Sequence, residues 1–165
     1  MDLIKKLFFD RFFYPMLQLY WKVFKPKTYG VRVVVWDKET NKILMVRHAY
    51  GDKTMWHFPG GGYNPKKVDP ATEAARELEE ETGIVAPVSH LLFTYTTNAQ
   101  GNRDTVEVFV VAATPDMRPK VNDPEIVEVA WKDADELLTT EKAYRITRQT
   151  IRKLPSGRNK KEPSR

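Results

Sequence analysis

The chain has 165 residues, the size of one domain with short appendages, and its 41% apolar and 30% charged residues are typical of a globular protein. It contains no cysteine, which excludes disulfide bonds, a thiolate metal site and a cysteine nucleophile. The net charge of +5 lies at the two ends: residues 1–30 carry +4, residues 152–165 carry +5, and residues 31–151 sum to −4. A groove for nucleic acid in the central domain is therefore not favoured, and no specific nucleic-acid partner is expected.

Residues 1–24 form an aromatic and basic segment that holds eight of the nineteen aromatic residues. Charged residues interrupt its apolar run, so it cannot be a spanning helix, and it lacks the cleavage site of a secretory signal. We expect a helix that kinks at Pro15. Three interpretations remain open: packing on the domain or on a second subunit of a homodimer, adsorption to a membrane surface, and lining of a substrate pocket. The expected location is cytoplasmic, with peripheral membrane contact as an alternative.

Short runs of β-branched and apolar residues predict a sheet in the central part of the chain. A β-hairpin is expected over residues 31–47, because two such runs flank a polar turn. The other expected elements are strands at 90–97, 105–113 and 126–131 and a terminal helix at 133–153. The chain therefore divides into an N-terminal helical extension (1–28), one domain (29–153) and a basic, disordered tail (154–165).

Residues 49–69 are rich in glycine, proline, lysine and aspartate and predict a long irregular loop, which is usually a functional feature. The helix expected at 70–82 is the clearest in the sequence. Asp69 suits its N-cap, Pro70 suits its first position, and Gly83 supplies its C-terminal stop. The loop therefore leads directly into a well-defined helix.

Three carboxylates, Glu77, Glu80 and Glu81, are spaced so that they share one face of this helix. Like charges at this spacing destabilise an exposed helix by about 0.2–0.5 kcal/mol per pair, so a positive partner is expected. Arg76 can reach Glu80 or Glu73 by helical spacing, and a divalent cation is the stronger candidate. A solvated acidic face is the alternative.

The sequence also restricts the kind of metal. The three histidines lie far apart without ligand-like spacing, so any metal is expected to be a hard cation bound by oxygen. The turn at 56–62 ends in three consecutive glycines, which let the backbone approach a phosphate or offer a carbonyl to a metal. Its place shortly before the acidic helix favours a combined phosphate and metal site.

Two stretches resemble the box of the Nudix family: Pro-Gly-Gly at 59–61 and Arg-Glu-Leu-Glu-Glu-Glu-Thr-Gly-Ile at 76–84. The second half of that box reads R-E-(aliphatic)-x-E-E-x-G-(aliphatic), and all seven specified positions are matched. The resemblance extends more loosely over residues 29–150. It implies an α/β/α sandwich with a mixed β-sheet, and hydrolysis of a nucleoside diphosphate linked to another group with Mg²⁺ or Mn²⁺.

The resemblance also implies roles for residues of the acidic helix. Glu77, Glu80 and Glu81 would be metal ligands, and one of them, with Glu77 and Glu80 as the candidates, would act as base for the attacking water. Arg76 would orient Glu77 through an ion pair. The catalytic candidates are therefore Glu77, Glu80 and Arg76.

Further ligands are implied outside the helix. The backbone carbonyl of Gly60, anchored by Pro59, would bind the metal. Family members often recruit a later glutamate from a loop before the last strand. Glu125 fits that place best, with Glu128 as the second candidate, and an exposed acid at a strand edge is the alternative for both.

Four residues are candidates for binding the substrate. Arg32 and Arg47 on the predicted hairpin are candidate phosphate ligands, with exposure to solvent as the alternative. Gly61 and Gly62 allow close backbone approach to a phosphate. Three aromatic side chains are candidates for stacking on a base, with packing as the alternative: Trp56, Tyr63 and Tyr95.

One position departs from the family pattern. The box asks for a glutamate eight residues before the arginine, and Val68 occupies that place. The loop holds one extra residue, so Lys66 and Lys67 stand where the family usually has Gly-Glu, and Asp69 is better placed as the helix cap. The substitution is expected to lower metal affinity or loosen the loop.

Two hypotheses of function follow. The leading one is Mg²⁺-dependent hydrolysis of a diphosphate linkage in a nucleoside diphosphate derivative or nucleotide, with a small-molecule nucleotide as substrate. The alternative is a catalytically weakened nucleotide-binding module, attached to a membrane or partner through its N-terminus. The intact acidic helix favours the first hypothesis, and Val68 favours the second.

Overall fold

The computed structural model describes residues 27–97 and 103–155. The aromatic segment 1–24 and residues 156–165 lie outside the described residues, so the interpretations offered for them stay predictions. Among the helices of the described ranges, none combines the length and the apolar character needed to cross a membrane.

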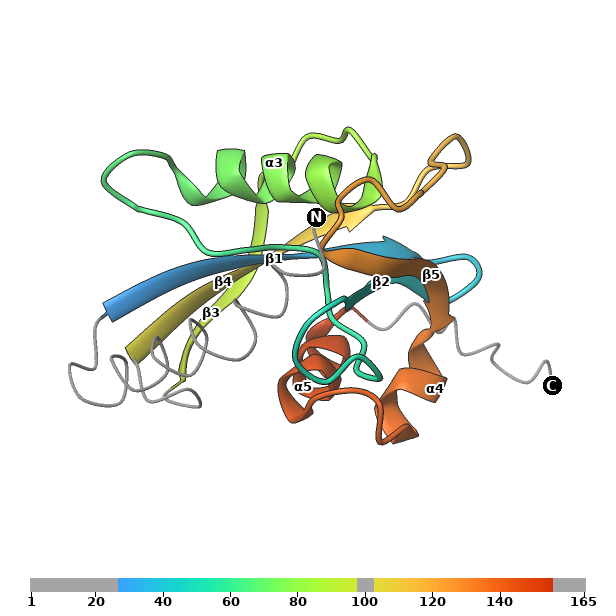
Figure 1. The fold of residues 1–165 in the computed structure, drawn as a ribbon. Helices are drawn as coiled ribbons and strands as arrows, with labels where there is room; N and C mark the ends of the chain where they lie inside the picture. Colours follow the sequence, from blue (N-terminus) through green and yellow to red (C-terminus); the bar gives the residue numbers. More distant parts are fainter. Residues whose placement is uncertain (1–26, 98–102, 156–165) are drawn as a thin grey trace, which may run out of the picture.

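The described residues form a mixed sheet with helices on both faces. In chain order the elements are β1 (Lys27–Asp37), β2 (Lys42–His48), α3 (Pro70–Thr82), β3 (His90–Thr97), β4 (Arg103–Ala112), β5 (Ile126–Asp133), α4 (Ala134–Thr139) and α5 (Arg145–Lys153). The strand order is β3-β4-β1-β2-β5, with β1 parallel to β4 and the other neighbouring pairs antiparallel. Helix α3 covers one face, and α4 and α5 cover the other (Figure 1). The expected α/β/α sandwich with a mixed sheet is confirmed.

Alternating side chains of β1 fill two cores, one on each side of the sheet. Val33 packs under α3 with Leu78. Val34 packs on the opposite face with Leu137 of α4 and Ile151 of α5. Strand β1 is therefore covered on both faces, which explains why it is a nearly continuous run of valines.

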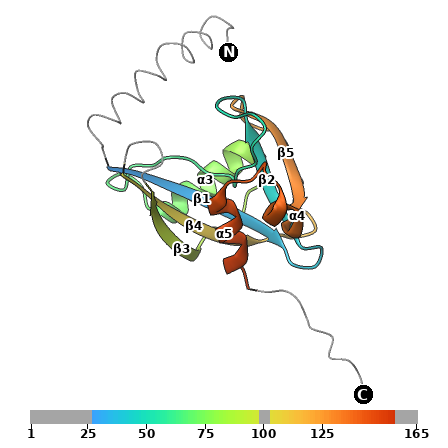
Figure 2. The same ribbon diagram turned by 90° about the horizontal axis from the view of Figure 1, so that it is seen from below.

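The predicted hairpin forms, but its strands separate soon after the turn. The ladder between β1 and β2 consists of Trp36 paired with Ile43 and Asp37 paired with Lys42. Beyond these pairs, β2 follows β5 while β1 follows β4, and the two strand pairs diverge (Figure 2). A space therefore opens in the sheet between β1 and β2.

The end of the long loop, residues 57–63, lies in this space; we call it the glycine segment. On one side, the Val46 N–H of β2 donates to the His57 carbonyl at 2.9 Å. On the other side, the β1 amides of Val31 and Val33 donate to carbonyls of the glycine segment at 2.9 and 2.8 Å. The glycine segment is therefore hydrogen-bonded into the sheet along both of its edges.

The prediction of one terminal helix at 133–153 is wrong, because the chain forms two helices, α4 and α5, joined by residues 140–144. In this connection the Lys142 carbonyl accepts the Trp56 N–H at 2.8 Å, and Ala143 forms a bridge with Trp56. Pairing with the long loop therefore replaces the helix at this point. No proline or glycine marks the break in the sequence.

The described ranges place two residues inside the domain that the predicted boundaries leave outside it. Lys27 is the first residue of β1, although the predicted extension runs to residue 28. Leu154 packs in the core beneath α4 and α5, although the predicted tail begins there. Lys27 and Leu154 therefore extend the folded part slightly beyond the predicted domain of residues 29–153.

Candidate active site

The acidic helix has the boundaries that its sequence predicts. The Asp69 carboxylate accepts the N–H groups of Ala71 and Thr72 at 3.1 and 3.0 Å. At the other end, Gly83 has a left-handed conformation (φ 69°), and its N–H donates to the Glu79 carbonyl at 2.8 Å. The two caps fix the register of α3.

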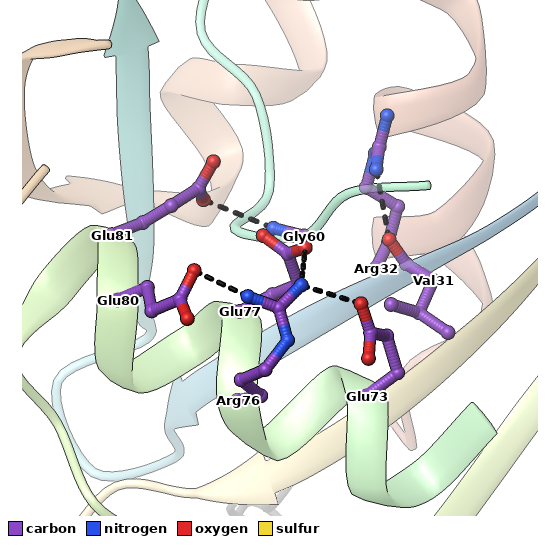
Figure 3. Close-up of polar contacts among 8 residues, drawn as sticks. All are labelled: Val31, Arg32, Gly60, Glu73, Arg76, Glu77, Glu80 and Glu81. Carbon is purple, nitrogen blue, oxygen red and sulfur yellow. Dashed lines mark hydrogen bonds and ion pairs between the residues drawn. The ribbon is translucent and has the colours of Figure 1, made fainter. Parts of the chain in front are cut away.

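Arg76 is the cation around which the carboxylates of α3 gather (Figure 3). Its Nη2 lies 2.5 Å from Oε1 of both Glu73 and Glu77, and its Nη1 forms an ion pair with Glu80. The hydrogen bond that Arg76 donates to Glu73, followed by the one it donates to Glu80, raises the pKa of the guanidinium. One guanidinium therefore offsets the repulsion among three carboxylates.

Glu81 points away from this cluster and binds the backbone of the glycine segment. Its Oε2 accepts the Gly60 N–H at 3.0 Å, and the residue is 8% exposed. Burial raises the pKa of Glu81 to about 8, while the hydrogen bond from Gly60 acts in the opposite direction. Burial also raises the pKa of Glu77. Desolvation therefore outweighs the charge of Arg76 at Glu77 and the Gly60 hydrogen bond at Glu81.

Two glycines are required by close packing between β1 and α3. Gly60 has φ 139°, and a Cβ at this residue would lie 2.2 Å from the Val31 carbonyl oxygen. A Cβ on Gly61 would lie 2.4 Å from Oε1 of Glu77. At Gly62 the nearest atom would be a carbonyl oxygen at 3.7 Å, so a side chain has room there. The first two glycines therefore set the distance between the loop and the carboxylates.

The two candidate arginines have different surroundings. The Arg32 guanidinium donates to the Val31 carbonyl at 2.8 Å, and its charge lowers the pKa of both Glu77 and Glu81. Arg47 forms an ion pair with Glu128 and lies over the ring of Trp56. The structure therefore brings Arg32 to the carboxylates of α3 and engages Arg47 with β5.

The two candidates for the later metal ligand, Glu125 and Glu128, lie in different surroundings. Glu128 lies on β5 opposite Arg47, and Glu125 is exposed, with its carbonyl accepting the Ala49 N–H at 2.7 Å. Asp123 was not considered in the sequence analysis, yet its charge raises the pKa of Glu81. Its place in an Asn-Asp-Pro turn is a signal that could have identified it.

The loop that carries Asp123 is fastened to the C-terminal end of α3. The Lys120 N–H donates to the Thr82 carbonyl at 2.9 Å, and Nδ2 of Asn122 donates to the Glu79 carbonyl at 3.2 Å. The first contact gives a partner to a carbonyl of the last helical turn, and the second adds to the bond that the Glu79 carbonyl already accepts from Gly83. They also hold Asp123 within electrostatic reach of Glu81.

The three aromatic candidates for base stacking are engaged in the fold to different extents. Trp56 is buried between Arg47 and Lys132. The Tyr63 hydroxyl donates to Glu107 at 2.8 Å, and burial is the main cause that raises its pKa to about 12. Tyr95 is half-buried, and the charge of Arg32 acts on it. Tyr95 is thus the one of the three on which the charge of Arg32 acts.

Comparison with known proteins identifies the family to which the chain belongs. A family model described as the NUDIX domain matches residues 26–154. The chain belongs to the Nudix family. The human protein named Nucleoside diphosphate-linked moiety X motif 6 is 30% identical over 131 residues, covering 78% of this chain and 41% of the relative. The RNA pyrophosphohydrolase of Pelagibacter ubique is 43% identical over 63 residues, or 38% of this chain and 39% of that protein.

A solved Nudix structure shows the same fold. The NUDIX domain of Shewanella oneidensis NrtR, complexed with ADP ribose, matches with a TM-score of 0.67 and 19% identity, covering 80% of this chain and 88% of that one. This chain spans about two fifths of the length of the curated human and mouse relatives.

Nudix proteins generally use divalent cations, and the donor chemistry of this site fits one. Carboxylate and carbonyl oxygens suit Mg²⁺, and burial has raised the pKa of two of the carboxylates, Glu77 and Glu81, which a cation would keep ionised. Within residues 27–97 and 103–155, however, no three acidic or histidine side chains converge as a metal site. The ion pairs of Glu77 and Glu80 with Arg76 account for this, because they turn both carboxylates toward the guanidinium.

The missing carboxylate of the Nudix box is partly replaced from within α3. Val68 lies in a turn whose backbone is held by Asn64, and it brings no charge to Arg76. Glu73, one turn before Arg76, is buried and supplies a carboxylate to the guanidinium instead. Arg76 therefore has three acidic partners, all from α3, and Val68 adds none.

Proposed function

We propose that this Nudix protein hydrolyses a diphosphate linkage in a nucleoside diphosphate derivative or nucleotide. The observation that carries the proposal is the acidic face of α3, which Arg76 organises and Glu81 joins to Gly60. The alternative, a solvated charged face, does not explain why the Glu81 carboxylate is buried and bonded to the Gly60 amide. The arrangement suits a site in which oxygen ligands meet a phosphate.

In this proposal Glu77, Glu80, Glu81 and the Gly60 carbonyl hold Mg²⁺ or Mn²⁺. Glu125, or in its place Asp123, completes the set. The metal, when bound, neutralises diphosphate oxygens and lowers the pKa of water.

The chain's own groups act around this centre. Arg76 holds the carboxylates of Glu77 and Glu80 in position through its two Nη atoms. Glu80, half-exposed, accepts the proton from the attacking water at its carboxylate. The Arg32 guanidinium binds a phosphate oxygen, and Gly61 and Gly62 give the phosphate access to the backbone. Arg47 is the other candidate phosphate ligand. Because Arg47 already forms an ion pair with Glu128, Arg32 is the better candidate.

The names of the relatives define the substrates to test. One relative is an RNA pyrophosphohydrolase, and one solved neighbour was crystallised with ADP ribose. The panel therefore contains ADP-ribose, other nucleoside diphosphate derivatives, nucleoside triphosphates and a 5′-triphosphorylated RNA. Phosphate or nucleotide release is measured in Mg²⁺ for the wild type, Glu80→Gln and Glu79→Gln.

We expect Glu80→Gln to lose a general base and slow turnover by about 10²- to 10⁴-fold. Glu79 is exposed on the same helix but outside the acidic face, so Glu79→Gln controls for the loss of one charge from α3. Absence of hydrolysis of the whole panel by the wild type, or equal rates for the wild type and Glu80→Gln, contradicts the proposal.

The alternative function, a nucleotide-binding module with weakened turnover, is favoured by Val68. It predicts that the wild type binds members of the panel without hydrolysing them. Attachment to a membrane, a homodimer and a cytoplasmic location depend on residues 1–24 or on the whole protein, and they stay predictions.

A further inference from the structure

A chain of four aromatic rings runs from the end of β2 to the start of α5. The Tyr50 and His48 rings are stacked with centroids 4.9 Å apart, and the His48 and His57 rings meet edge to face at 4.7 Å. The His57 and Tyr144 rings lie 5.1 Å apart. We call these four residues the ring chain. The histidines lie far apart in the sequence, yet the structure brings the rings of His48 and His57 into contact.

The ring chain is buried in the middle and open at both ends. His48 is 8% exposed, whereas Tyr50 and Tyr144 are 41% and 42% exposed. Here the two tyrosines are the exposed members. The neighbouring rings are inclined to one another by 29°, 75° and 59°, so a planar ligand would stack on one exposed tyrosine ring at a time.

The two imidazoles also carry an energetic cost that packing alone does not explain. Burial is the main cause that lowers the pKa of His48 and His57 to about 4, so both rings are neutral at pH 7. Among the described residues, Nδ1 of His48 has no hydrogen-bond partner. Apolar side chains would fill the same volume without burying an unpaired nitrogen.

The ring chain adjoins the proposed catalytic centre through the backbone and through two charges. His57 is three residues before Gly60 in the glycine segment, and its backbone is bonded to β2. The Arg32 guanidinium, which acts on Glu81, also acts on both histidines. The Asp123 carboxylate likewise acts on both Glu81 and His48.

We infer that the ring chain is the platform on which the nucleobase of the substrate stacks, with the phosphates extending from it toward Arg32 and the acidic face of α3. This inference rests on the proposed function and deepens it. The other candidates for stacking are less suitable, because Trp56 is buried, Tyr63 is bonded to Glu107, and Tyr95 packs against the core that contains Leu137 and Ile151. The substrate is therefore a phosphate compound with a base, rather than a sugar phosphate or an inorganic polyphosphate.

The test compares two ligands that share a phosphate and a ribose and differ in the base. Binding of AMP and of ribose 5-phosphate to the full chain is measured by calorimetry, with GMP, CMP and UMP as further probes. Stacking on aromatic side chains is sequence-tolerant, so we expect at least one nucleotide to bind about tenfold more tightly than ribose 5-phosphate.

The variants remove the exposed rings. The double variant Tyr50→Leu/Tyr144→Leu is expected to weaken nucleotide binding about tenfold and to leave ribose 5-phosphate binding as it was. Tyr50→Phe/Tyr144→Phe keeps the rings and is expected to restore nucleotide binding. Tyr29→Leu removes a tyrosine outside the ring chain and controls for the loss of a ring. Thermal unfolding confirms that each variant is folded.

Three results overturn the inference: no nucleotide binds more tightly than ribose 5-phosphate, the leucine variant binds nucleotides as the wild type does, or both ligands weaken equally. Turnover is tested separately. If Glu80→Gln loses hydrolysis while the leucine variant hydrolyses the substrate with the KM of the wild type, the proposed function is supported and the ring chain is not the base site. Binding that depends on the base, without hydrolysis, supports the ring chain and overturns the proposed hydrolysis.

Discussion

The two sides of the glycine segment bury ionisable groups with opposite consequences. On the α3 side, burial raises the pKa of Glu77 and Glu81, so these carboxylates gain from any added cation. On the β2 side, burial lowers the pKa of His48 and His57, and both imidazoles are neutral at pH 7. The site therefore has two halves. The carboxylates on the α3 side are stabilised by added positive charge, and the imidazoles on the β2 side are uncharged at pH 7. Such a division suits a ligand with a charged end and an aromatic end.

The largest expected effect comes from disturbing the charged half alone. In Gly61→Ala the new methyl group would lie 2.4 Å from Oε1 of Glu77, so the carboxylate has to move. A displacement of about 1 Å at a catalytic group can cost about 10²-fold in rate, and we expect a loss of this order in kcat.

Gly62→Ala is the matched comparison, because its methyl group would find its nearest neighbour at 3.7 Å. We expect a clearly smaller loss of kcat than in Gly61→Ala. Nucleotide binding to the ring chain should survive in both variants. If Gly62→Ala is as inactive as Gly61→Ala, the contact with Glu77 is not what matters.

An intermediate effect is expected from Asp123, which acts electrostatically on both halves. Asp123→Asn removes a negative charge near Glu81 and should raise the Mg²⁺ concentration for half-maximal activity by about tenfold, the lower end of the range for groups that support metal ligands. Glu125→Gln is the companion variant. A larger shift in Glu125→Gln than in Asp123→Asn would identify Glu125 as the late acid.

The smallest expected effect concerns the free energy of unfolding, which should depend on pH in opposite directions for Glu81 and for the two histidines. It is measured by urea unfolding in EDTA. Folding raises the pKa of Glu81 from 4.5 to about 8, so the folded chain keeps a proton that the unfolded chain releases. Its contribution to the free energy of unfolding is therefore lost as the pH rises from 4.5 to 8. We expect Glu81→Gln to abolish this decline.

The histidines have the opposite sign. Folding lowers their pKa values from 6.5 to about 4, so the unfolded chain binds protons that the folded chain does not. Their contribution is present above pH 6.5 and is lost as the pH falls toward 4. His57→Gln should reduce this loss of stability at acid pH and leave the Glu81-dependent decline between pH 4.5 and 8 unchanged. If Glu81→Gln and His57→Gln change the pH dependence of the free energy of unfolding in the same way, the contrast between the two halves is contradicted.

Local signals predicted the charged half of the site, and contacts between distant segments created the rest. Asp69, Pro70 and Gly83 define α3 to the residue, because caps act over a single helical turn. The spacing to Arg76 likewise gave its ion pairs with Glu73 and Glu80. These features need no knowledge of the tertiary fold.

The neutral half depends on tertiary contacts that leave no pattern in the sequence. His48 and His57 meet because β2 has an irregularity between Arg47 and His48 and pairs with the returning loop. Asp123 reaches Glu81 because its loop docks on the end of α3. The break between α4 and α5 has the same origin, since Trp56 pairs with a segment that lacks any helix-breaking residue.

The pairing of the glycine segment with both β1 and β2 makes the site part of a cooperative unfolding unit. The amides of Val31 and Val33 donate to carbonyls of the glycine segment rather than to another strand, so we expect these bonds to slow their hydrogen exchange. The segment cannot swing open as a lid without breaking the centre of the sheet. Ligand that stabilises the segment should therefore slow exchange at these two central amides, so that occupancy of the site can be followed by NMR from the middle of the fold.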